Sequence, residues 1–227
     1  MKNIFVDFFD TVCFRHIHSH QVFLQWAKVI RAKFPNIAET YTAEQLVVER
    51  NNVINRLGKE YEEPPYKNVM GELYKELKPC MGTCSEEDFI SASKEMDIAV
   101  ELGCQYPNMK LIKYLWKCKK TGSKIYIVSD FYLPQDCYQV FLRHMNIESL
   151  FEGIYVSETY NKTKRKGTLY DFVLKQLGAD PAECLMKNGE RLSQMALTAI
   201  EKSKSYSIDK VYKQWMKVMN VMLNEAN

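Results

Sequence analysis

The fold expected for this chain is decided by one stretch near its N-terminus, Ile4-Phe5-Val6-Asp7-Phe8-Phe9-Asp10-Thr11-Val12. A short apolar strand ends there at an acidic residue, Asp7, and a threonine, Thr11, follows four positions later. In α/β proteins the carboxyl ends of the strands form the edge of the sheet at which ligands bind. A carboxylate at that edge can attack phosphorus or carbon and form a covalent intermediate. Taken alone, the stretch fits equally an acidic strand end that merely begins a turn.

Length and composition are those of an ordinary globular protein. The 227 residues suffice for one domain with a large insertion or for two small domains. A net charge of +3, with Lys and Arg spread along the chain, argues against nucleic acid as a partner. No segment approaches the roughly 20 apolar residues of a membrane span, and the N-terminus lacks the order of a signal peptide. We therefore expect a cytoplasmic protein that does not bind membranes.

The cysteines are odd in number and scattered: Cys13, Cys80, Cys84, Cys104, Cys118, Cys137 and Cys184. In a cytoplasmic chain this pattern is typical of free thiols that act as small apolar residues. Cys80 and Cys84 have turn-like spacing, but a zinc site needs about four ligands and the sequence has no second pair.

Short strands alternate with helices in the second half of the sequence. Strand patterns are predicted at Asn3–Val6, Lys124–Val128, Gly153–Val156 and Cys184–Lys187, with a weaker one near Tyr206–Ile208. Helical patterns are predicted at Leu133–Met145, Thr168–Leu177, Arg191–Lys202 and Asp209–Asn224. This alternation predicts a parallel sheet with helices on both faces, the α/β class.

Residues 15–105 break the alternation. They carry four helical patterns without a strand, at Val22–Phe34, Ala43–Leu57, Tyr66–Leu77 and Glu86–Leu102. The segment Pro107–Lys120 then returns the chain to the second strand. We expect an α/β core built from residues 1–14 and 106–227, and a helical cap domain formed by residues 15–105.

Two later stretches supply groups that complement Asp7. The strand Lys124–Val128 is followed by a hydroxyl, Ser129, and a basic loop that contains Lys164 leads into the helix at Thr168. An acid, an alcohol and an amine at one sheet edge provide a nucleophile, a hydrogen-bond donor and a positive charge for phosphoryl transfer. Basic runs are also common on solvated surfaces, so Lys164 alone does not decide between a catalytic lysine and a solvated surface.

In this order the motifs resemble those of the haloacid dehalogenase (HAD) superfamily. Its first motif reads Asp-x-Asp-x-Thr, which Asp7 and Thr11 match at the first and last positions. Ser129 matches the second motif, and Lys164 matches the third, with Gly167, Leu169 and Tyr170 at the expected spacing. The resemblance implies a Rossmann-like parallel-sheet core with an inserted all-helical cap. It also implies that Asp7 and Lys164 are catalytic and that Thr11 and Ser129 bind phosphate.

More particular strings point to a subgroup of this superfamily. Residues 7–11 (Asp-Phe-Phe-Asp-Thr), Arg15 and residues 129–134 (Ser-Asp-Phe-Tyr-Leu-Pro) resemble predicted hydrolases found with bacterial surface-polysaccharide genes. Arg15 is a candidate for binding the substrate anion, because its side chain suits bidentate contacts. The alternative is a salt bridge within the cap.

Two departures from the superfamily bear on activity. Phe9 stands where its phosphatases have a general acid/base Asp, and the loss of a general acid costs roughly 10²–10⁴ in rate. The superfamily's dehalogenases also lack that Asp. In the fourth motif, read as Asn188-Gly189-Glu190-Arg191-Leu192-Ser193-Gln194, Gly189 and Gln194 occupy the acidic places.

A Mg²⁺ cofactor is therefore expected only at a weakened site. Mg²⁺ usually takes one or two protein carboxylates together with substrate phosphate. The remaining ligands are the Asp7 carboxylate, the Phe9 backbone carbonyl and, from displaced positions, Glu190 or Asp130. Asp10 is expected to cap the loop after the first strand. His16, His18 and His20 are read as a polar hinge, with a metal site as the alternative.

The function expected from these observations is that of a HAD-like hydrolase with a phosphatase-type site centred on Asp7 and weak activity at best. Its substrate would be a small phosphorylated metabolite or a sugar phosphate. Two alternatives stay open, namely an inactive binding or regulatory module with the same fold and, less favoured, a metal-free dehalogenase. The sequence identifies neither the substrate nor the oligomeric state.

Overall fold

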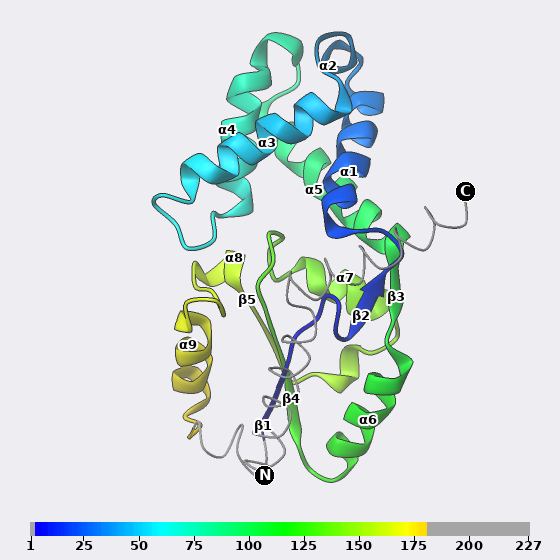
Figure 1. The fold of residues 1–227 in the computed structure, drawn as a ribbon, viewed down its shortest axis with the longest axis vertical. Coiled ribbons are helices and arrows are strands. Elements are labelled where there is room, and N and C mark those ends of the chain that lie inside the picture. The colour runs from blue at the N-terminus through cyan, green and yellow to red at the C-terminus, as the bar shows by residue number, and fades with distance from the viewer. Residues whose placement is uncertain (1–2, 181–227) are drawn as a thin grey trace, which may run out of the picture. The chain divides into compact units, whose positions relative to one another are not determined.

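A three-stranded parallel sheet organises residues 3–180, the part of the chain that the computed structural model describes (Figure 1). Its strands are β1 (Asn3–Val6), β4 (Lys124–Ser129) and β5 (Gly153–Val156), in the order β1-β4-β5. Ile4 lies opposite Ile125, and Tyr126 lies opposite Gly153. The predicted α/β class with a Rossmann-like parallel sheet is confirmed.

Side chains alternate between the two faces of the sheet, as the two-residue period of a strand requires. Ile125 and Ile127 join the larger hydrophobic core, whereas Val128 packs with Leu169 and Val173 in a smaller cluster. Helices cover both faces: α6 (Met109–Lys120) and α7 (Cys137–His144) belong to the larger core, and α9 (Thr168–Leu177) to the smaller cluster. Two short helices, η2 (Glu148–Leu150) and α8 (Ser157–Tyr160), flank β5.

The helices between β2 and β3 gather beyond the carboxyl ends of the sheet strands (Figure 1). They are α1 (Ser19–Lys33), α2 (Pro35–Thr40), α3 (Ala43–Leu57), α4 (Tyr66–Leu77), η1 (Lys78–Cys80) and α5 (Glu86–Cys104). A buried ion pair joins α3 to α5, because both guanidinium ends of Arg50 donate to the Asp97 carboxylate at 3.0 Å. The Tyr66 hydroxyl donates to the same carboxylate at 2.8 Å.

A two-stranded antiparallel ribbon connects these helices to the rest of the described chain. It consists of β2 (Cys13–Arg15) and β3 (Gln105–Pro107), with Phe14 opposite Tyr106. Strands this short have no detectable alternation, and the sequence did not predict them. The expected division into a core (1–14 and 106–227) and a cap (15–105) remains a prediction, since residues up to Asp180 form one compact unit.

Several predicted limits agree with the structure, and two helix starts are wrong. The ranges of β1, β5, α3, α4 and α9 match the prediction, and Gly178 ends α9 with φ 57°, as a C-cap glycine does. Helix α1 begins at Ser19 rather than at Val22, because His18 caps it by accepting the His20 N–H. Helix α7 begins at Cys137 rather than at Leu133. The reason is a tertiary contact: the backbone N–H groups of Phe131 and Gln135 donate to the hydroxyls of Ser157 and Thr159 instead of entering a helical turn.

Some predictions lie outside the described residues, namely the strands Cys184–Lys187 and Tyr206–Ile208 and the helices Arg191–Lys202 and Asp209–Asn224. Within residues 3–180, no helix combines the length and the apolar character that crossing a bilayer needs. The cysteines in this part of the chain are all free thiols.

Candidate active site

The site begins where two neighbouring parallel strands end. Asp7 directly follows β1, and Ser129 is the last residue of β4, so the pairing of these strands brings both to one edge of the sheet. The Ser129 hydroxyl donates to Asp7 Oδ1 at 2.9 Å, and the Phe8 backbone N–H donates to the same oxygen at 2.9 Å. Ser129 is buried, whereas the Asp7 side chain is 40% exposed and open to a reactant.

Lys164 completes the group from a loop that follows β5 and α8. Its Nζ lies 2.7 Å from Asp7 Oδ2. The loop is held by Asp130, whose carboxylate accepts the backbone N–H groups of Lys164 at 2.7 Å and Arg165 at 3.3 Å. The acid, alcohol and amine singled out in the sequence therefore meet, and Asp130 positions the backbone of the loop.

Thr11 lies in the tight turn after β1. The Phe8 carbonyl accepts the N–H groups of Thr11, Val12 and Cys13, and Asp10 takes a left-handed conformation with φ 57°. The Thr11 carbonyl accepts a hydrogen bond from the Asn108 side chain at 2.8 Å. Asn108 was not predicted as part of the site, although an Asn that precedes a helix is a recognisable N-cap.

Phe9 is packed rather than directed at a reactant. Its ring is 9% exposed and stacks on Phe131, with the ring centroids 3.8 Å apart. The Arg15 guanidinium carbon lies 4.2 Å from the centre of the Phe9 ring. An aromatic stack thus fills the place where phosphatases of the superfamily are expected to carry an acid.

Arg15 is occupied by carboxylates. Its guanidinium donates to the two oxygens of Glu101 at 3.0 and 3.1 Å and to Asp10 at 3.5 Å. Burial alone would lower the pKa of Arg15, but the hydrogen bonds to Glu101 and the negative charges of Glu101 and Asp10 together outweigh burial and raise that pKa above its ordinary value. The salt bridge considered as the alternative for Arg15 is the contact observed, and Asp10 pairs with Arg15 rather than capping the loop.

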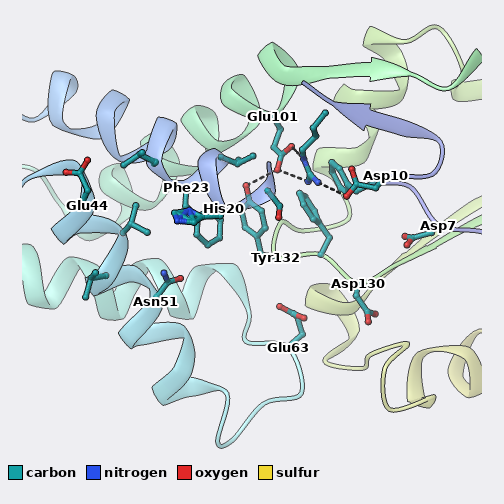
Figure 2. A pocket seen from close by; sticks show the side chains of 18 residues that line it. Asp7, Asp10, His20, Phe23, Glu44, Asn51, Glu63, Glu101, Asp130 and Tyr132 are labelled. Atoms are coloured by element: carbon teal, nitrogen blue, oxygen red, sulfur yellow. Dashed lines mark hydrogen bonds and ion pairs between the residues drawn. The ribbon is translucent and has the colours of Figure 1, made fainter. Parts of the chain in front are cut away.

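A cavity of about 900 Å³ opens beside Asp7. Figure 2 shows it running from Asp7 and Asp130 to Glu44 and Asn51 on α3, with Glu63 between them. Apolar side chains form part of its wall: Val22, Phe23, Leu24, Val47, Val48 and Phe131. Burial, followed by the nearby Asp130 charge, raises the pKa of Glu63 above its ordinary value. A cavity of this volume can hold a small-molecule metabolite.

The described residues do not by themselves make a magnesium site. Both Asp7 oxygens accept hydrogen bonds or pair with Lys164, and Asp130 accepts backbone N–H groups. Between residues 3 and 180, no three His, Cys, Asp or Glu side chains are grouped so that they could hold a metal ion. The Phe9 carbonyl remains a predicted ligand, and Glu190 lies outside the described residues.

The three histidines have separate surroundings. His16 stacks on Tyr106, with ring centroids 4.4 Å apart, and His18 accepts the His20 N–H at the start of α1. The polar hinge and the alternative metal site therefore both stay predictions.

A hydrogen-bonded network at the wall of the cavity was not predicted from the sequence. The Tyr132 hydroxyl lies 3.3 Å from an oxygen of Asp97 and 3.3 Å from an oxygen of Glu101, both on α5. Burial, together with these carboxylates, raises the pKa of Tyr132 well above its ordinary value, so the hydroxyl keeps its proton. No pattern in the sequence could reveal this contact, because its partners are more than 30 residues apart.

Comparison with known proteins identifies the family through a family model and a shared fold through solved structures. The family model described as haloacid dehalogenase-like hydrolase matches residues 1–186, and no curated protein matches the chain. Among solved structures, a 2-haloacid dehalogenase from Pseudomonas syringae pv. Tomato DC3000 is similar with a TM-score of 0.61 at 12% identity, covering 81% of this chain and 76% of that one. A protein assigned as a β-phosphoglucomutase from Thermotoga maritima gives 0.50 at 15% identity, covering 81% and 74%. At sequence identities this low, the two solved structures show only that this chain shares their fold. The match over most of its length shows that this chain belongs to the haloacid dehalogenase-like hydrolases.

Proposed function

We propose that this protein hydrolyses small phosphate monoesters through a covalent intermediate on Asp7. The observation that carries the proposal is the meeting of Asp7 with Ser129 at 2.9 Å and with Lys164 at 2.7 Å, at the mouth of a cavity of metabolite size. Phosphoryl transfer depends mainly on positioning and charge stabilisation, and these side chains supply both.

In the proposed reaction an oxygen of Asp7 attacks phosphorus, the bond from phosphorus to the ester oxygen breaks, and the departing oxygen takes a proton from water to leave as an alcohol. Lys164 and Ser129 then stabilise the phosphoryl oxygens with a positive charge and a hydroxyl donor, and Thr11 lies in the adjoining turn. Water subsequently cleaves the aspartyl phosphate and restores Asp7. Because Phe9 cannot protonate the leaving group, we expect turnover to be roughly 10²–10⁴ below that of an enzyme with an acid there.

The proposed substrate is a small phosphorylated metabolite, with a sugar phosphate as the first class to test. The structural similarity to a protein assigned as a β-phosphoglucomutase supports that choice. The sequence likeness to hydrolases found with bacterial polysaccharide genes points the same way. The free thiols of the described residues favour a reducing compartment, and we place the reaction in the cytoplasm.

The test is turnover of an aryl phosphate and a panel of sugar phosphates by the purified protein, with Mg²⁺ and with EDTA. Asp7→Asn should abolish turnover, and Lys164→Ala should lower it by about 10²-fold or more, because the positive charge that stabilises the phosphoryl oxygens is lost. Arg165→Ala is the matched control, since Arg165 is the neighbouring cation and is exposed. Full activity of Asp7→Asn would refute the proposal.

A second candidate function is a non-catalytic module that binds phosphorylated ligands. The packing of Phe9 against Phe131 and the pairing of Arg15 with Glu101 favour it, since both remove groups that catalysis could use. Calorimetric binding of phosphate without any turnover would identify this case. Release of chloride from a 2-chloro acid would instead identify a dehalogenase.

A further inference from the structure

The loop between α3 and α4, residues 58–65, contacts the segment that carries Lys164, and we name it the docking loop. The Asn161 side chain accepts the backbone N–H groups of Glu62 at 2.7 Å and Glu63 at 3.3 Å. Just beyond the docking loop, Glu158 accepts the N–H of Tyr66, the first residue of α4, at 2.7 Å. These bonds join residues about 100 positions apart and fix the docking loop beside the site.

The side chain of Glu62 makes the most direct of these contacts. Its Oε2 accepts the Thr168 hydroxyl at 2.6 Å, the Thr163 N–H at 3.1 Å and the Thr163 hydroxyl at 3.4 Å. Thr163 immediately precedes Lys164, and Thr168 is the first residue of α9. One carboxylate oxygen thus holds both ends of the short loop from which Lys164 projects.

Glu62 is suited to this role as a charged group. Hydrogen bonds from Thr168 and from the Thr163 backbone, together with the nearby Lys166 charge, hold the pKa of Glu62 below its ordinary value. It also lies at the N-terminus of α9, where the helix dipole favours a negative charge. The side chain is therefore ionised at neutral pH.

The Lys164 loop is held from two directions. On the side of the sheet, Asp130 accepts the N–H groups of Lys164 and Arg165. On the side of the helices, Glu62 binds Thr163 and Thr168. The Lys164 ammonium group reaches Asp7 Oδ2 at 2.7 Å from a loop fixed by both carboxylates.

We propose that Glu62 is a positioning residue for Lys164, so that contact between the docking loop and residues 161–168 sets the Lys164 ammonium group beside Asp7. The inference rests on the proposed function and adds to it: the helical segment takes part in assembling the site. Without the Glu62 contact, the Lys164 loop would keep its bonds to Asp130 and its internal bond between Thr163 and Thr168, and we expect the ammonium group to be held less closely to Asp7.

The first experiment measures the position of Lys164 without any reaction. Acetylation of lysines at pH 8, followed by peptide mass spectrometry, should be slow at Lys164, whose side chain is 18% exposed in its pair with Asp7. Glu62→Ala should speed Lys164 acetylation severalfold and leave unchanged the acetylation of Lys119, whose side chain is 26% exposed in its pair with Glu152. Glu60→Ala is the matched control, since Glu60 is an exposed residue of the same loop. General destabilisation would accelerate both lysines and would contradict the proposal.

The second experiment uses aryl phosphate turnover. Glu62→Ala should lower kcat by about tenfold to a hundredfold, the range that a small misplacement of a catalytic group produces. Glu62→Gln keeps one acceptor oxygen and should recover part of the loss. If Glu62 acts through Lys164, the double variant Glu62→Ala/Lys164→Ala should equal Lys164→Ala alone.

The two experiments separate the inference from the proposed function. Wild-type turnover with equal kcat and equal Lys164 acetylation in Glu62→Ala and Glu60→Ala would overturn the inference and leave the function standing. Faster Lys164 acetylation in Glu62→Ala, without turnover by the wild type, would support the positioning contact and refute the function.

Discussion

Phe9 shows, at the scale of a single residue, how aromatic packing occupies a position where phosphatases of the superfamily are expected to carry an acid. Its ring stacks on Phe131 at 3.8 Å and meets Phe8 edge-on at 5.0 Å. The Arg15 guanidinium covers another part of the ring. Contacts of this kind add to the free energy gained by burying an aromatic side chain.

Phe9→Ala should therefore destabilise the protein strongly. Truncation of a buried Phe costs about 3–5 kcal/mol, which corresponds to a melting temperature roughly 6–20 °C lower in a chain of this size. Thermal unfolding followed by circular dichroism measures the shift. Val48→Ala, at a 54% exposed position, is the control and should change the melting temperature little. Equal shifts for the two variants would show that the stack contributes nothing.

At this scale the sequence predicted some residues well because their position depends on local order. Asp7 and Ser129 follow directly from strand ends, and Lys164 from the order of motifs, so all three were expected at one edge. The pairing of Arg15 with Glu101 was not expected, because Glu101 lies 86 residues away and no local pattern links the two. Glu62 was missed for the same reason, since Thr168 is 106 residues distant.

At the scale of elements, a buried ion pair fastens α3 to α5. Arg50 is 1% exposed and Asp97 fully buried, and the guanidinium also lies 4.1 Å from the Phe23 ring centre. Asp97 further accepts hydrogen bonds from Tyr66 and Tyr132. Such a pair is costly to break from one side, because the remaining charge is left buried.

Arg50→Met should lower the free energy of unfolding by about 3–5 kcal/mol. The double variant Arg50→Met/Asp97→Asn removes the stranded charge and should recover more than half of that loss. Arg56→Met is the comparison, because the pair of Arg56 with Glu72 is exposed to solvent and is worth about 1 kcal/mol or less. Urea unfolding of the wild type, the two single variants and the double variant measures these differences in the free energy of unfolding. A double variant no more stable than Arg50→Met would contradict the explanation.

Element limits were predictable where periodicity and capping agree. Helix α3 begins at a capping box formed by Thr42 and Gln45, and α9 ends at Gly178. The start of α7 was not predictable, since hydroxyls from Ser157 and Thr159 take the backbone donors that precede it. Tertiary contacts of this kind override local preference.

At the scale of the whole described molecule, the exposure of the cysteine side chains distinguishes interior positions from surface positions. Cys13, Cys104 and Cys137 are buried, whereas Cys80, Cys84 and Cys118 are partly exposed. Burial raises the pKa of Cys104 to about 11 and that of Cys137 to about 12. Only the thiolate reacts with alkylating agents, so burial and a raised pKa act in the same direction.

Native protein at pH 8 should be alkylated at Cys118 and hardly at Cys104. A pKa raised from 9.0 to about 11 leaves about a hundredfold less thiolate at Cys104. Alkylation of Cys104 should therefore increase as the pH rises toward 11, provided that the protein stays folded. Mass spectrometry of labelled peptides measures the rates, with urea-unfolded protein as the control in which all sites react. Rapid labelling of Cys104 in native protein at pH 8 would contradict the structure.

The β2–β3 ribbon has a consequence for how this architecture can change. Because Phe14 and Tyr106 are directly opposite one another, the chain departs from the sheet and comes back at a single spot. A segment whose two ends touch can be lengthened or exchanged for another while the strands that hold Asp7 and Ser129 stay where they are. We therefore expect that a graft at these two positions, if it keeps a carboxylate in the place of Glu62, would give the proposed site at Asp7 a different selectivity.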